Sequence, residues 1–186
     1  MHAALLYRRG ETLTDAELSA LRLDGLLFEV GDCYLPADVP ETAEARLLTI
    51  APLLRDDLVV SGPSAAWVHG AGSTPPRRCH LRPHVAHRVR LPGSTPAVLH
   101  EGVVAPAEIT LISGIRVLTV TAALVDLARM RRQDTMLEWL NALMSLHPEQ
   151  CAAAVEELRS RERLPGKLRA IAALESAYDE VTRYTS

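Results

Sequence analysis

Two serines, a histidine and a distant aspartate are the residue types in this chain that could perform hydrolysis. Ser61, Ser64 and His69 lie in the stretch VVSGPSAAWVHG, and Asp126 follows much later. A serine activated by a histidine and oriented by a carboxylate can attack acyl groups. Such a serine usually lies on a sharp G-x-S-x-G turn, and here Ala66 replaces the second glycine. The pattern therefore supports a hydrolase only weakly.

The same stretch has the start and stop signals of a short helix. Ser61 or Ser64 can cap it, Pro63 is tolerated in its first turn, and Gly70 can end it. His69 then falls in the last turn, where the helix dipole favours a protonated imidazole. We therefore predict a structural helix and no catalytic nucleophile at this place.

Phosphotransfer and metal chemistry find little support in the motifs. Neither G-x-x-x-x-G-K-[ST] nor G-x-G-x-x-G occurs. Weak catalytic candidates are Asp126 and Lys167, the latter at an expected helix start where a phosphate could bind; only this hypothesis would require ATP and Mg²⁺. The spacing of His80, His84 and His87 suits one helix face, but Pro83 and nearby β-type alternation oppose a helix. We predict no metal site and no cofactor.

Charge is unevenly distributed along the chain. Residues 1–57 carry five arginines against eleven acidic residues, whereas residues 58–117 carry six arginines against two glutamates. We expect a basic surface in this middle segment that suits phosphate or an acidic partner, formed by Arg77, Arg78, Arg82, Arg88 and Arg90. Alternation in HLRPHVAHRVRLPG places Arg88 and Arg90 on the exposed face of a strand.

The N-terminal elements are expected in the order of a winged helix-turn-helix. The sequence predicts short helices over Ala3–Arg9 and from about Thr14 to Gly25, then a hairpin turning at Gly31-Asp32. DNA contacts there would come from Arg8, Arg9 and Arg22. The acidic residues around them oppose DNA binding, because counterion release requires cations.

The rest of the chain is expected to be a second domain. A linker at residues 36–40 precedes a helix ending near Asp57, a β segment over about 58–120 with a hairpin at Ser113-Gly114, and four helices over about 119–185. We predict an α+β fold: a winged helix-turn-helix domain over residues 1–40, then a mixed β/helical domain over residues 41–186 that ends in a helical bundle.

Composition is typical of a soluble globular protein, with 48% hydrophobic and 23% charged residues. No apolar run approaches the roughly 18 residues that a membrane span needs, and the N-terminus does not resemble a signal peptide. Cys33, Cys79 and Cys151 have no C-x-x-C spacing and are expected to be buried thiols. We expect a cytoplasmic monomer without membrane contact.

Three stretches together resemble a known family. They are LLFEVGDCYLP, VVSGPSAAWVHGAG and EITLISGIRVLTVTAALVDLAR, and they span most of residues 10–130. The patterns S-x-x-S-A-A-x-x-H-G and I-x-x-x-x-G-I-x-V-x-T…L-x-D-L-A are similar to those of the AbiEi antitoxins, partners of AbiEii-type nucleotidyltransferase toxins. One departure is that Ala122 and Ala123 replace an Arg-Thr pair, while Leu124, Asp126 and Leu127 remain.

The resemblance implies a cytoplasmic antitoxin. Its C-terminal domain would neutralise a toxin that transfers nucleotides to RNA, with or without a stable complex, and its N-terminal domain would bind promoter DNA and autoregulate the operon. Two alternatives stay open. One is a serine phosphotransferase that silences the toxin by phosphorylation, and the other is a plain transcriptional repressor.

Overall fold

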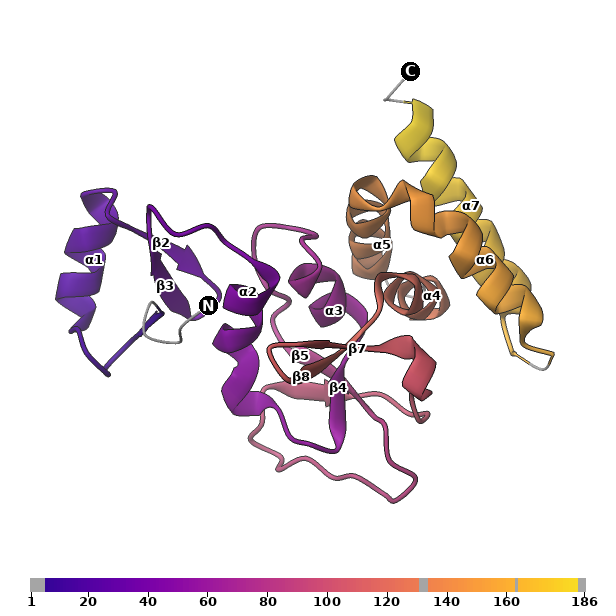
Figure 1. Cartoon of the computed structure of the whole chain (residues 1–186), viewed down its shortest axis with the longest axis horizontal. Helices are drawn as coiled ribbons and strands as arrows, with labels where there is room; N and C mark the ends of the chain where they lie inside the picture. The colour runs from indigo at the N-terminus through magenta and orange to yellow at the C-terminus, as the bar shows by residue number, and fades with distance from the viewer. Residues whose placement is uncertain (1–5, 131–133, 163, 184–186) are drawn as a thin grey trace.

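The computed structural model describes residues 6–130, 134–162 and 164–183 of the 186-residue chain. It contains a small N-terminal sheet, a larger central sheet and a group of helices toward the C-terminus (Figure 1). The N-terminal sheet and the last two helices lie at opposite ends of the molecule in this view. The predicted α+β class is therefore confirmed.

The N-terminal part is a three-stranded antiparallel sheet with one helix packed on it. Its helix α1 (Asp15–Leu23) starts with a capping box, in which Thr14 and Glu17 each accept a backbone N–H of the other. The strands have the order β1-β3-β2: β1 (Tyr7–Arg8), β3 (Cys33–Pro36) and β2 (Leu27–Val30). The hairpin predicted at Gly31-Asp32 joins β2 to β3 and is confirmed.

The helix predicted over Ala3–Arg9 is wrong where the structure describes it. Tyr7 and Arg8 are extended and pair with Tyr34 and Cys33, while residues 1–5 lie outside the described residues. A helix this short is not stable by itself, whereas pairing with the edge of β3 gives the backbone N–H and C=O groups hydrogen-bond partners. Within the described residues only α1 precedes the hairpin, so the winged helix-turn-helix stays a prediction.

Helix α2 (Ala43–Ile50) connects this part to the central sheet. Thr42 caps it, and the short 3-10 helix η2 (Ala51–Leu53) extends it. The central sheet has the order β6-β5-β4-β8-β7, with the fully buried β4 (Leu58–Val60) in the middle. The other strands are β5 (Cys79–Pro83), β6 (Ala97–Leu99), β7 (Ile109–Ile112) and β8 (Ile115–Leu118).

Two turns of the central sheet test the sequence predictions in opposite ways. The hairpin at Ser113-Gly114 is confirmed, since β7 and β8 pair there and both turn residues have positive φ, 50° and 81°. The strand expected from alternation around Val89 is wrong, because residues 84–96 form an irregular connection between β5 and β6. Val89 is buried and packs this loop against the core. The apolar residues of the segment therefore hold a loop in place and do not form the face of a sheet.

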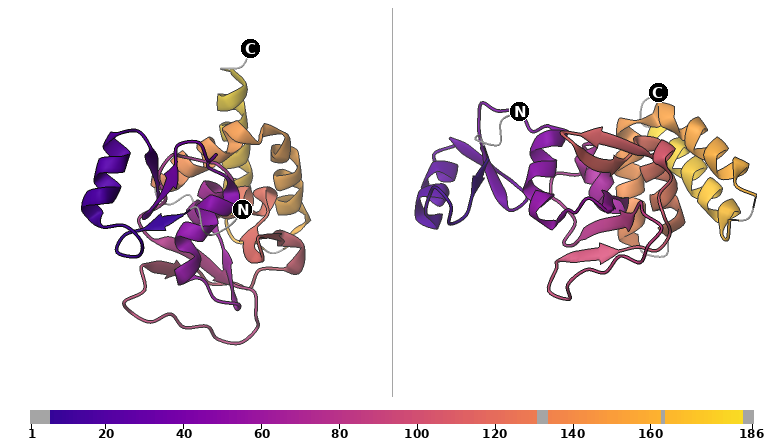
Figure 2. Two further views of the ribbon diagram at one scale, coloured as in Figure 1. Left: turned by 60° about the vertical axis from the view of Figure 1, so that its left-hand side comes forward. Right: turned by 60° about the horizontal axis from the view of Figure 1, so that its bottom comes forward.

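Helices cover the sheet and complete the core. The short α3 (Gly62–Val68) is buried along its whole length, and α4 (Val120–Met130) is buried from Ala122 to Ala128. Around α4 pack α5 (Asp134–Leu146), α6 (Cys151–Ser160) and α7 (Lys167–Arg183), so the predicted four-helix end of the chain is confirmed (Figure 2). Short 3-10 helices precede β7 and α6: η3 (Pro106–Glu108) and η4 (Pro148–Gln150).

The three cysteines are free and buried, as the sequence predicts. Among the described residues, no helix combines the length and the apolar character that crossing a bilayer requires.

Candidate functional site

The serine, histidine and aspartate of the hydrolase hypothesis contact different partners. The Ser64 hydroxyl oxygen accepts the backbone N–H of His80 at 2.9 Å, and His69 Nε2 lies 2.6 Å from the carbonyl oxygen of Leu118. Asp126 Oδ2 accepts the backbone N–H of Gly62 at 3.1 Å. These contacts tie α3 to β5, β8 and α4. They assemble no catalytic triad, and the structural interpretation of this stretch holds.

Two details of α3 bear on the sequence prediction. Ser61 occupies the N-cap position, but its buried hydroxyl makes no capping bond and has no partner among the described residues. The helix start is held instead by Asp126. Burial lowers the pKa of the His69 imidazole, which opposes the protonated form that the helix dipole favours.

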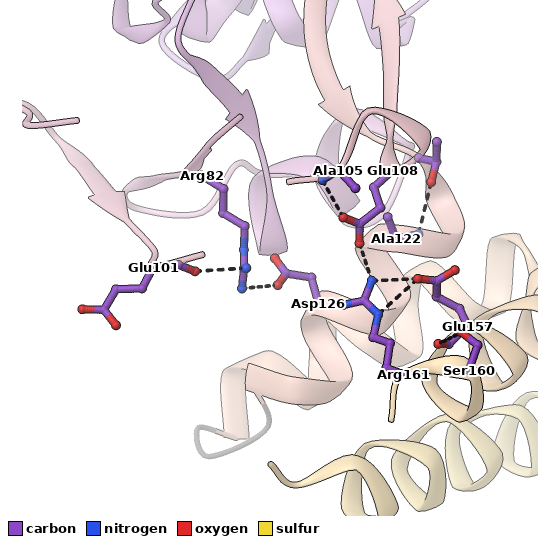
Figure 3. A network of polar contacts seen from close by, with 10 residues as sticks. Arg82, Glu101, Ala105, Glu108, Ala122, Asp126, Glu157, Ser160 and Arg161 are labelled. Atoms are coloured by element: carbon purple, nitrogen blue, oxygen red, sulfur yellow. Dashed lines mark hydrogen bonds and ion pairs between the residues drawn. The ribbon is translucent and has the colours of Figure 1, made fainter. Parts of the chain in front are cut away.

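Arg82 and Asp126 form a buried ion pair at the centre of the domain. Arg82 Nη2 lies 2.5 Å from Asp126 Oδ1, with 14% and 5% of the two side chains exposed. Figure 3 shows the guanidinium between this carboxylate and the carbonyl oxygen of Glu101, to which Nη1 donates at 3.1 Å. Burial raises the pKa of Asp126, and the charge of Arg82 opposes this shift. Arg82 therefore points inward and does not lie on the exposed basic surface where the sequence prediction placed it.

A second polar network lies beside this pair. Arg161 Nη2 contacts Glu108 Oε1 at 2.5 Å and Glu157 Oε1 at 2.7 Å, which joins η3 to the C-terminal end of α6 (Figure 3). Each charge in it has an opposite partner, so the network is suited to holding these elements together.

Lys167, the other weak catalytic candidate, also has a structural contact. Its ammonium group donates to the carbonyl oxygens of Arg159 and Arg161 at 2.9 and 2.8 Å and so caps the end of α6. No contact within the described part of the chain joins Lys167 to Asp126. The structure does not bring the two candidates together as a phosphotransfer site would require.

Four arginines of the middle segment do lie at the surface without a carboxylate partner. Arg78 donates to the carbonyl oxygen of Ala97, and Arg77, Arg88 and Arg90 have no side-chain partner among the described residues. Two of them precede β5 and two lie on the loop that follows it. We call Arg77, Arg78, Arg88 and Arg90 the arginine surface.

The N-terminal arginines are in the opposite situation. Arg9 and Arg22 both lie near Glu29 Oε1, at 3.8 and 3.9 Å, and Arg9 also lies 3.7 Å from Asp15 Oδ1. Arg8 donates to the carbonyl oxygen of Leu48 and lies 3.9 Å from Glu11. Nearby carboxylates therefore offset the charge of all three predicted DNA contacts.

His80 and His84, which were weighed as metal ligands, contact different protein groups and do not converge on one site. His84 bonds to the carbonyl oxygen of Asp56 at 2.6 Å, whereas His80 Nδ1 lies 2.8 Å from His100 Nε2. No group of three His, Cys, Asp or Glu side chains able to hold a metal ion occurs in residues 6–130, 134–162 and 164–183. His100 could not be recognised as the partner of His80 from local sequence patterns, because parallel pairing of β5 and β6 brings the two histidines together.

Comparison with protein families places the chain. The model of the AbiEi antitoxin C-terminal domain matches residues 58–176. The chain belongs to the AbiEi antitoxin family. No curated protein matches the sequence significantly. Among solved structures, the chain is similar to the crystal structure of the RV2827C protein from Mycobacterium tuberculosis, with 18% identity, a TM-score of 0.47, and coverage of 91% of this chain and 67% of that one.

The AbiEi match extends further than the sequence motifs indicated. It runs from the first residue of β4 through α6 and into α7, so the last helices belong to the family domain. The arginine surface, the Arg82–Asp126 pair and the Arg161 network all lie within it. Residues 1–57, with α1 and α2, lie outside the matched range.

Proposed function

We propose that this AbiEi antitoxin acts in the cytoplasm against a cognate nucleotidyltransferase toxin, and that it contacts this toxin through the arginine surface. The observation that carries the proposal is the contrast among the arginines of the chain. Those at positions 77, 78, 88 and 90 are exposed without a carboxylate partner, whereas carboxylates accompany the N-terminal ones. Unpaired guanidinium groups attract an acidic surface and steer its approach.

This arrangement also suits a transient encounter. Exposed charge pairs contribute more to the rate of association than to the lifetime of a complex. Neutralisation without a stable complex, with the antitoxin as a monomer, is therefore compatible with contacts of this kind.

A co-expression growth assay tests the proposal. The cognate toxin would be expressed with the wild type or with a variant in which Arg77, Arg78, Arg88 and Arg90 are all changed to Glu. We expect loss of protection for this variant and full protection for Arg159→Glu/Arg183→Glu, which changes exposed positions on α6 and α7. Circular dichroism would verify folding. Full protection by a folded quadruple variant would remove the arginine surface from the mechanism.

The finer roles have separate tests. Promoter binding and autoregulation predict that Arg8→Ala and Arg22→Ala weaken binding to operator DNA; a plain repressor would show this and give no rescue from any toxin. Phosphotransfer predicts labelled phosphate on the toxin in the presence of a nucleoside triphosphate and Mg²⁺, lost in Asp126 or Lys167 variants. The structural contacts of these two residues count against that alternative.

A further inference from the structure

A cavity of about 560 Å³ lies between the start of β5, the end of β6 and the helices α4 and α5. This volume is within the range of about 300–1,000 Å³ that is typical of pockets for small ligands. Its apolar wall includes Trp139, Met130 and Val98, and its polar groups are Arg77, Arg78, His80 and His100. The hydrolase, metal and basic-surface hypotheses make no use of this combination.

The two histidines form a neutral hydrogen-bonding unit. Their rings stack with centroids 5.0 Å apart, and His80 Nδ1 shares one proton with His100 Nε2 at 2.8 Å. If His80 donates this proton, its Nε2 is an acceptor and His100 Nδ1 carries the remaining hydrogen; in the other tautomer the roles reverse. The pair therefore presents one donor and one acceptor in either case. Burial lowers both pKa values to about 4, helped by the charge of Arg78 at His80 and by those of His80 and Arg82 at His100, and this keeps the pair neutral near pH 7.

The remaining groups suit the two ends of one type of ligand. Trp139 is half-buried in the wall, and aromatic side chains in such positions stack on flat heterocycles. Arg77 and Arg78 are exposed, and Arg77 has no side-chain partner in the described part of the chain. Guanidinium groups recognise phosphate oxygens through paired N–H donors. A flat ring with mixed donors and acceptors, attached to phosphate, matches all of these features.

We propose that this cavity binds a nucleotide, with its base against Trp139 and the His80–His100 pair and its phosphate on Arg77 and Arg78. The ligand is a free nucleotide or the terminal nucleotide of an RNA chain, which share this chemistry. The proposal does not depend on the antitoxin role, because it concerns the isolated protein.

Tryptophan fluorescence can test it directly on the full-length protein. Trp67 is fully buried and does not line the cavity, so a change on ligand binding reports mainly on Trp139. Titrations would use each ribonucleoside triphosphate, a nucleoside without phosphate, inorganic triphosphate and a short single-stranded RNA. We expect saturable quenching by nucleotides or by RNA, with weaker binding of the nucleoside and of inorganic triphosphate. Whichever of free nucleotide and RNA binds more tightly identifies the source of the ligand.

Paired variants separate specific contacts from general charge. Arg77→Ala/Arg78→Ala should weaken nucleotide binding about tenfold or more, since each removes a charge-assisted hydrogen bond. Arg159→Ala/Arg183→Ala removes the same charge from α6 and α7 and should leave binding unchanged. Circular dichroism would verify that both variants are folded. The absence of saturable quenching, equal binding of inorganic triphosphate and nucleotide, or equal weakening by the two double variants would each overturn the proposal.

Discussion

Arg82 on β5 and Asp126 on α4 are held together by a 2.5 Å ion pair that is largely shielded from solvent. Asp126 also accepts the backbone N–H of Gly62, so one carboxylate joins the first residue of α3, the central sheet and the helical bundle. Gly62, Arg82 and Asp126 all lie within residues 58–176, the range that matches the AbiEi antitoxin C-terminal domain. The pair therefore joins the main elements of the family domain.

Removing one member of this pair should destabilise the protein strongly. Asp126→Ala leaves the Arg82 charge buried without its partner, and we expect a loss of about 3–5 kcal/mol in the free energy of unfolding. The double variant Arg82→Met/Asp126→Leu removes both charges and should recover much of this loss. Urea denaturation would measure both. A double variant less stable than Asp126→Ala would contradict this account.

Gly62 should resist substitution because of its backbone conformation. Its φ is +48°, and an added Cβ would lie 3.2 Å from Met130 Sδ. We expect Gly62→Ala to cost about 1–3 kcal/mol, since the left-handed region is unfavourable for other residues. Gly93→Ala is the control, because an added Cβ there meets nothing within 4 Å and the backbone is ordinary. Thermal unfolding of both variants decides it, and equal melting temperatures would refute the argument.

The stability of the protein should decrease as the pH decreases because of the His80–His100 pair. Both pKa values are about 4 in the folded protein, against 6.5 for a free imidazole, so the unfolded chain binds more protons between these values. The stability that the neutral pair contributes is complete above about pH 6.5 and is lost as the pH drops toward 4. Denaturant midpoints across this range should decrease less steeply for His80→Gln/His100→Gln than for the wild type. His69, whose pKa burial also lowers, leaves part of the slope in place. Parallel slopes would exclude the pair as the cause.

Local signals in the sequence were sufficient for most elements. Pro63 and the Ser113-Gly114 pair mark a helix start and a hairpin turn, and the structure has them there. Helical periodicity after Thr119 was equally informative, because the apolar stripe of each helix must face the core. The error around Val89 arose because a similar spacing of apolar residues also occurs in a loop that packs Val85, Val89 and Leu91 against the core.

The contacts that define the candidate sites could not be predicted in this way. The sequence around Arg82 predicts an exposed arginine, because nothing in it shows that α4 places Asp126 beside this side chain. His80 and His100 meet only because β5 and β6 run parallel across a long connection. Such pairings depend on the order of strands in the sheet, and hydrophobic periodicity does not specify that order.

Arg46 should be the most sensitive attachment of α2 to the family domain. Its guanidinium lies 2.5 Å from Glu41, donates to the carbonyl oxygen of Trp67 and stacks at 5.3 Å from the Trp67 ring centre. Because α2 precedes the matched range, this contact joins residues outside the family domain to α3 within it.

Substitutions at Arg46 should therefore be graded. Arg46→Ala loses the ion pair, the hydrogen bond and the stacking, and should cost about 3 kcal/mol or more because Glu41 and the Trp67 carbonyl lose their partner. Arg46→Lys keeps the charge but lacks the planar guanidinium group, so its free energy of unfolding should lie between those of the wild type and Arg46→Ala. Arg159→Ala is the control, since both side chains of its pair with Glu175 are more than half exposed and the pair should contribute less than about 1 kcal/mol. Urea unfolding gives the free energies, and near-ultraviolet circular dichroism follows the packing of Trp67. A lysine variant as stable as the wild type would show that charge alone, without the planar contacts, holds α2 in place.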